Sequence, residues 1–315
     1  MNEIVLKRKS LESLDYESIM HPEDKETIEW LKKLKVPYYS MTDFLKELAK
    51  HPFDKSFRER LQQWIAIFNA GPDYYTFNDF LAATTTKYRE ACSEIEYQGE
   101  GLNVTPDSIP NMYNQLVEAC RILGSDEIPS YSTDWYYGPY SMSNGEQHRR
   151  IIMMSGSVDL MTDDEMLFML GHEMGHHLCG HKPFHMLVEC FYMPIMDDPA
   201  FKAWASIIRM PLLDWYRKSD YTADRMGLLC CQDLRVALST MIKKAGLPKS
   251  HYNEINIEGF IEQAKEFEEL HTGNWDTIIK TLSLRSAESP WLVVRAARLL
   301  EWVESGEYQR IINSN

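Results

Sequence analysis

The chain has 315 residues, of which 44% are hydrophobic and 25% charged, and its formal net charge is −14. Such a composition is that of an ordinary globular protein, and it excludes a largely disordered chain, a collagen-like chain and a small disulfide scaffold. The acidic excess repels phosphate backbones, so we expect no nucleic-acid partner.

The sequence indicates a cytoplasmic protein without a transmembrane segment. No stretch reaches the roughly 18 uncharged apolar residues of a membrane-spanning helix. The basic residues near the N-terminus follow an apolar run, which is the reverse of a secretory signal. The six cysteines form no CxxC motif and no regular framework, so we expect buried, reduced thiols.

The first hundred residues are expected to be mainly helical. The segments His21–Lys25 and His51–Lys55 are alike, and two helices that each begin with proline explain this better than a repeat architecture. Gly, Pro, Asn and Asp concentrate between residues 98 and 110, which is typical of a boundary. These features predict a helical N-terminal region, residues 1–98, and a larger domain, residues 99–315.

The larger domain is predicted to open with one helix, over residues 111–123. Residues 124–144 are rich in Tyr, Ser, Pro and Gly, so we expect a loop with short strands there. The apolar run that follows predicts a strand over residues 148–155.

Three longer helices are predicted after this strand. A capping-box signal, Thr-Asp-Asp-Glu at residues 162–165, predicts a helix that runs to about Leu178. We expect a second helix over residues 222–244, and a third over residues 291–303 that a Ser-Pro pair begins. Because strands are few, the predicted fold class is α+β, predominantly helical.

The first of these helices carries the motif His172-Glu173-Met174-Gly175-His176. Residues four apart lie on one helix face, so the two imidazoles can bind a single Zn²⁺. Glu173 projects beside such an ion rather than onto it, where it can take a proton from the attacking water and pass it to the leaving amine. The alternative is a helix whose two partly buried histidines pair with core groups.

A catalytic zinc has three protein ligands and one open position, so a third ligand must come from elsewhere. Asp220 and Asp224 are also four residues apart, near the start of the second predicted helix. One can bind the metal while the other accepts the free N–H of a ligating histidine. In the alternative interpretation both acids only favour a helix N-terminus. Glu189 is a competing ligand.

The segment His172–His181, HEMGHHLCGH, resembles the active-site helix of the HtpX and CAAX prenyl endopeptidase group, peptidase family M48, which are zinc endopeptidases of the gluzincin type. Those helices often carry a further histidine, matched by His181. The strand and turn at residues 152–160 are similar to the family's strand-Ser-Gly turn. The family's Glu-(Phe/Tyr)-x-Ala-Asp corresponds to residues 220–224, and its His-Pro pair with a later arginine corresponds to Ser289-Pro290 with Arg295.

The resemblance covers about residues 102–303, and the His-Pro-x-Asp entry of the family's soluble members is similar to residues 21–24. It implies a zincin-like domain with a small sheet beside the active-site helix, and a zinc metalloendopeptidase with one Zn²⁺ per chain. The implied ligands are His172, His176 and Asp220. The implied roles of the other residues are general base and then acid for Glu173, orientation of a ligand for Asp224 and stabilisation of the transition state for Arg295.

The chain departs from the family pattern at two positions. Asp220 stands where the family has Glu, so the second helix must lie closer to the metal, or the site is attenuated. Ser289 replaces a histidine that helps to bind the tetrahedral intermediate, so we expect slower turnover. The rival hypotheses are therefore a peptidase-fold protein that binds zinc and peptides without cleaving them, and a helical interaction scaffold without a metal.

The expected substrate is a peptide or an unfolded protein. In gluzincins an edge strand beside the active-site helix pairs with the substrate backbone, and residues 151–155 are the candidate strand. Met154, Ser155 and Gly156 are accordingly predicted to contact the peptide. The N-terminal region and the aromatic segment Tyr131–Tyr140 are candidates for a cover over the groove. No oligomeric state is predicted.

Overall fold

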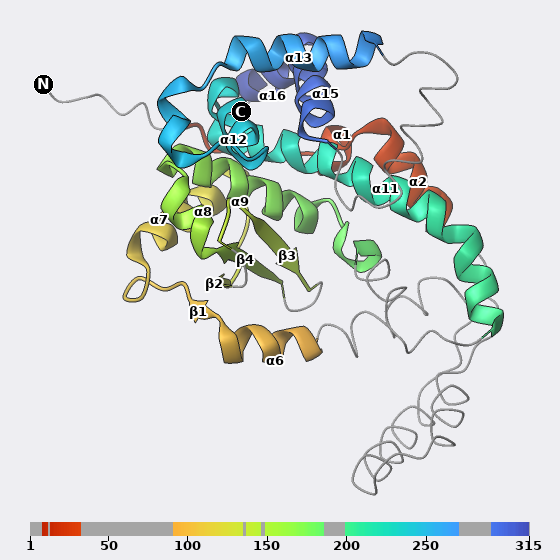
Figure 1. The fold of residues 1–315 in the computed structure, drawn as a ribbon. Helices are drawn as coiled ribbons and strands as arrows, with labels where there is room; N and C mark the ends of the chain where they lie inside the picture. The colour runs from red at the N-terminus through yellow and green to blue at the C-terminus, as the bar shows by residue number, and fades with distance from the viewer. Residues whose placement is uncertain are drawn as a thin grey trace, which may run out of the picture.

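The computed structural model describes residues 8–11, 13–32, 91–134, 137–145, 149–185, 199–270 and 291–314. This part of the chain is mostly helical with one small sheet (Figure 1), which confirms the predicted α+β class. In chain order the elements are α1 (Tyr16–Ile19), α2 (Pro22–Lys32), α6 (Ala91–Glu100), β1 (Leu102–Asn103), α7 (Pro110–Leu123), β2 (Ser130–Thr133), β3 (Ser141–Asn144), β4 (Arg150–Met154), α8 (Ser155–Leu160), α9 (Asp163–Leu178), α11 (Pro199–Cys231), α12 (Leu234–Lys244), the 3₁₀ helix η3 (Lys249–Glu254), α13 (Ile257–Leu270), α15 (Leu292–Glu304) and α16 (Glu307–Ser314).

The sheet has the strand order β1-β2-β4-β3, with β2 and β4 parallel and the other pairs antiparallel. The predicted strand is therefore β4, and it lies inside the sheet. Its side chains alternate between two faces, as the period of a strand requires. Ile151 and Met153 join the main core, whereas Ile152 and Met154 pack against Tyr97 of α6. Both faces of β4 are thus buried.

Helix α9 begins and ends where the sequence predicts. The Thr162 hydroxyl accepts from the Glu165 backbone N–H at 3.3 Å, and the Glu165 carboxylate accepts from the Thr162 N–H at 2.8 Å, so the capping box is confirmed. Past the helix, Gly180 has a φ of +72°, a value that glycine adopts at little cost. The helix lies between the sheet and α11 (Figure 1), and most of its own side chains are buried.

The prediction of one helix over residues 222–244 is wrong, because two helices share this stretch. Helix α11 ends at Cys231, and Gln232 has a φ of +52°, which breaks the helical path. The Asp233 side chain then caps α12 by accepting from two backbone N–H groups of its first turn. Since α11 begins at Pro199, Asp220 and Asp224 lie in its interior. The interpretation that these acids favour a helix N-terminus is therefore wrong.

Helices α9 and α11 approach each other closely at two glycines. A Cβ atom on Gly171 would lie 2.4 Å from the Cβ of Cys230, and one on Gly175 would lie 2.8 Å from the Cβ of Met226. Real Cβ atoms do not come so close, so only glycine fits at these positions. We call the contact the glycine seam, defined by Gly171 and Gly175 on α9. It brings the backbone of α11 close to the helix face that carries the two histidines.

Helices α1, α2 and α15 pack on α11 (Figure 1), which joins the two ends of the described chain. Arg225 of α11 donates to the Ile19 carbonyl at 2.9 Å. Helix α15 confirms the third predicted helix, whereas its expected first residues, Ser289 and Pro290, lie outside the described residues. Among the described helices, none has both the length and the apolar character that crossing a membrane requires.

Candidate metal centre

Three side chains from two helices converge at the glycine seam. The Nε2 atoms of His172 and His176, one turn apart on α9, lie 3.2 Å from each other. Asp220 of α11 places its Oδ1 atom 3.5 Å from Nε2 of His176 and 3.9 Å from Nε2 of His172. All three side chains are buried, and they form one of two groups in the described residues that could hold a metal ion.

This donor set fits zinc. Ligand atoms about 2.0–2.2 Å from a shared tetrahedral Zn²⁺ lie about 3.3–3.6 Å apart. The three separations given above are close to this value, and two imidazoles with one carboxylate leave a fourth position open, as a catalytic zinc site does. The shorter acid at position 220 therefore reaches the place of a third ligand. Glu189, the competing candidate, lies outside the described residues.

Asp224 and Arg295 form a second layer behind these groups. The Asp224 Oδ1 atom lies 3.0 Å from Nδ1 of His172, so its carboxylate can accept the ring N–H and leave Nε2 with a lone pair. Arg295 donates to both oxygens of Asp224, at 2.6 and 2.8 Å, and to Oδ2 of Asp220 at 3.3 Å. Burial alone would raise the pKa values of both acids, but Arg295 and the neighbouring histidines together outweigh burial and hold both pKa values below the ordinary value.

The role predicted for Arg295 at the transition state stays a prediction, and the contacts of this residue add a second role. The prediction aims its guanidinium at the transition state of the substrate. In the structure this group is buried, and its donors are directed at the two carboxylates. A guanidinium held by a bidentate contact and a further carboxylate is fixed in place and largely neutralised. These contacts place Arg295 where it can orient the acids of the site.

Glu173 lies beside the three converging groups and is buried. Burial opposes its ionisation, but His172 and His176 favour the carboxylate, and the net pKa lies below the ordinary value for glutamate. Ser141 of β3 donates to Oε1 of Glu173 at 2.7 Å. One oxygen of the carboxylate is thus held by the sheet. Burial lowers the pKa of His176 to about 4, which keeps the imidazole neutral at pH 7, as a metal ligand must be.

A cleft of about 550 Å³ opens onto this site. One wall is β3, which is the last strand in the sheet order, so within the described residues no strand pairs with its outer edge. Other parts of the wall come from the ends of distant helices, including Lys244 and Trp291. Tyr140, at the rim, is 51% exposed, whereas Tyr131 of the same aromatic segment is buried. The other candidate for a cover over the groove is the N-terminal region, and most of residues 1–98 lie outside the described residues.

The substrate contacts predicted for Met154, Ser155 and Gly156 are wrong. Strand β4 has neighbours on both sides, and Met154 is fully buried. The Ser155 hydroxyl donates to Asp134, and a Cβ atom on Gly156 would lie 2.3 Å from the backbone nitrogen of Gly138. Gly156 thus permits close packing within the domain. The edge available to a peptide is β3, whose polar sequence Ser-Met-Ser-Asn carries no strong strand signal.

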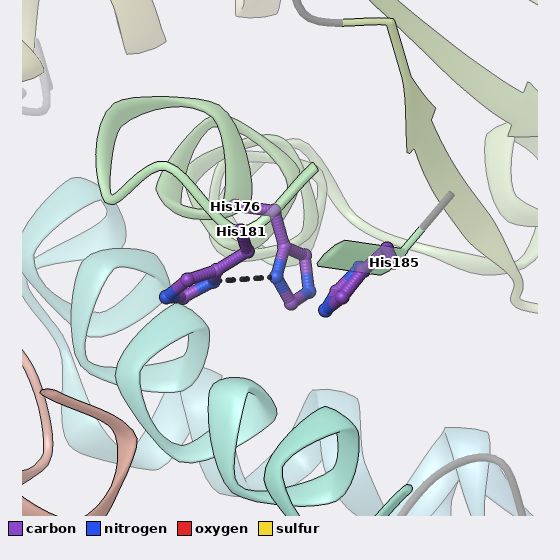
Figure 2. A group of neighbouring side chains, drawn as sticks. All are labelled: His176, His181 and His185. Atoms are coloured by element: carbon purple, nitrogen blue, oxygen red, sulfur yellow. Dashed lines mark hydrogen bonds between the residues drawn. The ribbon is translucent and has the colours of Figure 1, made fainter. Parts of the chain in front are cut away.

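Sequence reasoning did not find Ser141 or His185. Ser141 of β3 contacts Glu173 of α9, 32 positions further along the chain, and no local pattern predicts this contact. His185 forms the second group of possible metal ligands with His176 and His181 (Figure 2). The density of histidines between residues 172 and 185 was the available signal for that group.

His177, on the side of α9 away from the site, makes stability dependent on pH. Its Nε2 atom lies 3.1 Å from the Arg150 carbonyl oxygen, and burial lowers its pKa to about 3. An unfolded histidine has a pKa of about 6.5, so below that pH the unfolded chain binds one more proton and the free energy of unfolding falls. Between pH 6 and 4, we expect the free energy of unfolding of the metal-free protein to fall less steeply in His177→Gln than in the wild type, by about 1.4 kcal/mol per pH unit. Urea unfolding at several pH values measures it, and equal slopes in both proteins would contradict the neutral, buried state of His177.

Comparisons with known proteins point to one family. The model of Peptidase family M48 matches residues 139–303, just over half of the chain. The Arabidopsis thaliana protein "Plastoglobule-localized metallopeptidase 48, chloroplastic" is 26% identical over 279 residues, which cover 88% of this chain and 78% of that protein. No solved structure matches the chain significantly.

Proposed function

Because this chain belongs to peptidase family M48, we propose that it is a zinc-dependent metalloendopeptidase that cleaves peptides or unfolded proteins. One observation carries the proposal. His172, His176 and Asp220 converge at the separations of zinc ligands, and a buried Glu173 that is not part of this donor set stands beside them at the wall of an open cleft. On the sequence features alone, we also propose that the protein acts in the cytoplasm.

The residues of the site divide the chemistry among them. A zinc ion, when bound, lowers the pKa of a water molecule and polarises the substrate carbonyl. Glu173 takes the proton of the attacking water on its carboxylate and then delivers it to the nitrogen of the leaving amine as the C–N bond breaks. The Ser141 hydroxyl occupies Oε1 of this carboxylate, so Oε2 is the oxygen that carries the proton. Arg295 keeps Asp220 and Asp224 ionised throughout.

The edge of β3 supports an extended substrate. The Met154 N–H donates to the Tyr140 carbonyl. These two residues continue the register of β3 and β4 by one pair beyond Ser141 and Met153. Hydrogen-bonded and non-hydrogen-bonded pairs alternate in such a ladder, so the backbone groups of Ser141 and Ser143 point away from β4. An extended peptide can add to this edge as a further strand. Folded proteins rarely offer such a segment, which favours peptides and unfolded chains.

Binding without cleavage is the alternative, and the placement of Glu173 argues against it. Keeping a buried carboxylate ionised costs stability, so we expect such a group where the function requires it. Capture of a peptide by the metal and the β3 edge requires no base at this position. Glu173 nevertheless lies next to both histidines and is oriented by Ser141.

The proposal is tested by metal analysis together with a cleavage assay. We expect purified protein to contain one zinc per chain and to degrade an unstructured protein substrate. A chelator should abolish cleavage, and added zinc should restore it, because hydrolysis depends on the ion. Absence of stoichiometric zinc would contradict the proposal, and zinc without any cleavage would favour the binding protein.

A further inference from the structure

A chain of hydrogen bonds runs from the metal site to the N-terminal helix α2. The Nδ1 atom of His176 lies 3.0 Å from Nδ1 of His181, and Figure 2 shows the two rings joined at these atoms. The other ring nitrogen of His181, Nε2, lies 2.9 Å from Oδ2 of Asp24. His181 and Asp24 are both fully buried.

The Asp24 carboxylate is held by two further groups. Trp215 of α11 donates its indole N–H to Oδ1 at 2.7 Å. The Thr222 hydroxyl contacts Oδ2 at 2.6 Å and itself accepts the backbone N–H of His21 at 2.8 Å. Because an ionised carboxylate can only accept, the Thr222 hydroxyl donates its proton to Asp24. Asp24 therefore accepts from Trp215, Thr222 and His181.

These contacts fix the positions of the protons when His176 binds a metal through Nε2. The proton of His176 is then on Nδ1 and is donated to Nδ1 of His181. His181 consequently carries its own proton on Nε2 and donates it to Asp24. Each step follows from the one before, because an indole N–H is a donor only and a carboxylate is an acceptor only.

We propose that Asp24 is a positioning residue of the metal centre, which acts through His181 to fix the tautomer and the ring orientation of His176. The inference rests on the proposed function. His172 contacts a carboxylate directly, that of Asp224. His176 reaches a carboxylate through two successive hydrogen bonds, and this carboxylate lies on a helix outside the residues that the family model matches. Groups that orient ligands in this way typically contribute 10–100-fold to metal affinity.

A second metal ion among His176, His181 and His185 is the competing explanation of this cluster. Both ring nitrogens of His181 already have partners. His185 contacts the Ser219 hydroxyl through Nε2 at 2.8 Å, and this hydroxyl donates to the Tyr216 carbonyl, so His185 donates to Ser219. To hold two ions His176 would have to lose the single N–H proton of its neutral ring and become an imidazolate, which is unfavourable. The contacts therefore favour the chain that ends on Asp24.

The substitution Asp24→Asn tests the proposal, because an amide has one acceptor and one donor end. Trp215 faces one end and can only donate, while His181 faces the other and must donate as well. Either orientation of the amide therefore sets a donor against a donor. We expect zinc affinity, measured by competition with a chromophoric chelator, to fall about 10–100-fold. Glu23→Gln, at an exposed neighbour on the same helix, is the matched control and should bind zinc like the wild type.

A double variant separates this role from a loss of folding. Trp215→Phe removes the donor that faces Oδ1, so in Asp24→Asn/Trp215→Phe the amide oxygen can turn toward His181, and zinc affinity should recover several-fold. The melting temperature of metal-free protein reports folding in each variant. In the zinc-loaded wild type, imidazole ¹⁵N shifts should place the proton of His181 on Nε2.

Four results would overturn the proposal. They are zinc affinity in Asp24→Asn within twofold of the wild type, a double variant that binds no better than the single one, the opposite tautomer of His181, and a second zinc per chain that His185→Ala removes. A wild-type chain that binds no zinc would contradict the proposed function before any variant is compared, and the inference would fall with it.

Discussion

Replacing Glu173 with Gln should reduce the rate of peptide hydrolysis about 10²–10⁴-fold while zinc content stays at one per chain. The amide has nearly the volume of the carboxylate and can still accept from Ser141 through its oxygen. It has no basic oxygen, so it cannot take the proton of the attacking water. Because Glu173 is not one of the three converging groups, its loss removes the chemistry and leaves the donor set intact.

The measurement is kcat on a fluorogenic peptide beside metal analysis of the same preparation. Glu258→Gln, at an exposed pair with Arg235 on a distant helix, serves as the control and should keep wild-type activity. Retained hydrolysis in Glu173→Gln would contradict the role of the base. If instead the wild type binds peptides without cleaving them and the variant binds equally well, the binding protein is the correct function.

Replacing Asp220 with Asn should weaken zinc binding more than 100-fold, beyond the 10–100-fold effect of a residue that only orients a ligand. The amide keeps the shape of the side chain but removes the charged oxygen that faces both histidines. It also removes a carboxylate that neutralises Arg295. Loss of the third ligand leaves two imidazoles, which is one fewer than catalytic zinc sites use.

The comparison with Asp224→Asn makes this prediction discriminating. Asp224 contacts His172 and Arg295 but does not belong to the converging donor set, so its replacement should weaken zinc binding only 10–100-fold. Chelator competition gives both affinities, and the melting temperatures of the metal-free variants show whether they fold. A larger effect at position 224 than at position 220 would exchange the two roles.

Local signals account for the parts of the fold that the sequence predicts. The capping box of α9, the apolar run of β4 and the pattern of α7 each depend on neighbours in the chain, and the structure contains all three elements. The break at Gln232 was missed because an apolar helical pattern continues on both sides of it. The predicted helix begins at residue 222, beside two acids of a kind that is common at helix N-termini, whereas α11 begins at Pro199.

In the site, too, local patterns predict some contacts and long-range packing decides the others. Spacing on one helix is enough to bring His172 and His176 together. The choice of β3 over β4 as the open edge depends on the order of strands in the sheet, which apolar content does not reveal. The contacts of Asp24 with His181 join residues 157 positions apart. Such a contact depends on how α2 packs on α11, and a linear pattern does not contain that information.

The glycine seam has a consequence for how this centre could change. The length of the acidic side chain at position 220 and the distance between α9 and α11 depend on each other. A longer side chain would need a larger distance between the two helices. A Glu at position 220 would push its oxygen past the point where the histidine nitrogens meet, unless a larger side chain at Gly171 wedged the helices apart. Neither substitution is expected to be neutral by itself. The two positions, which lie on different helices, are therefore expected to covary.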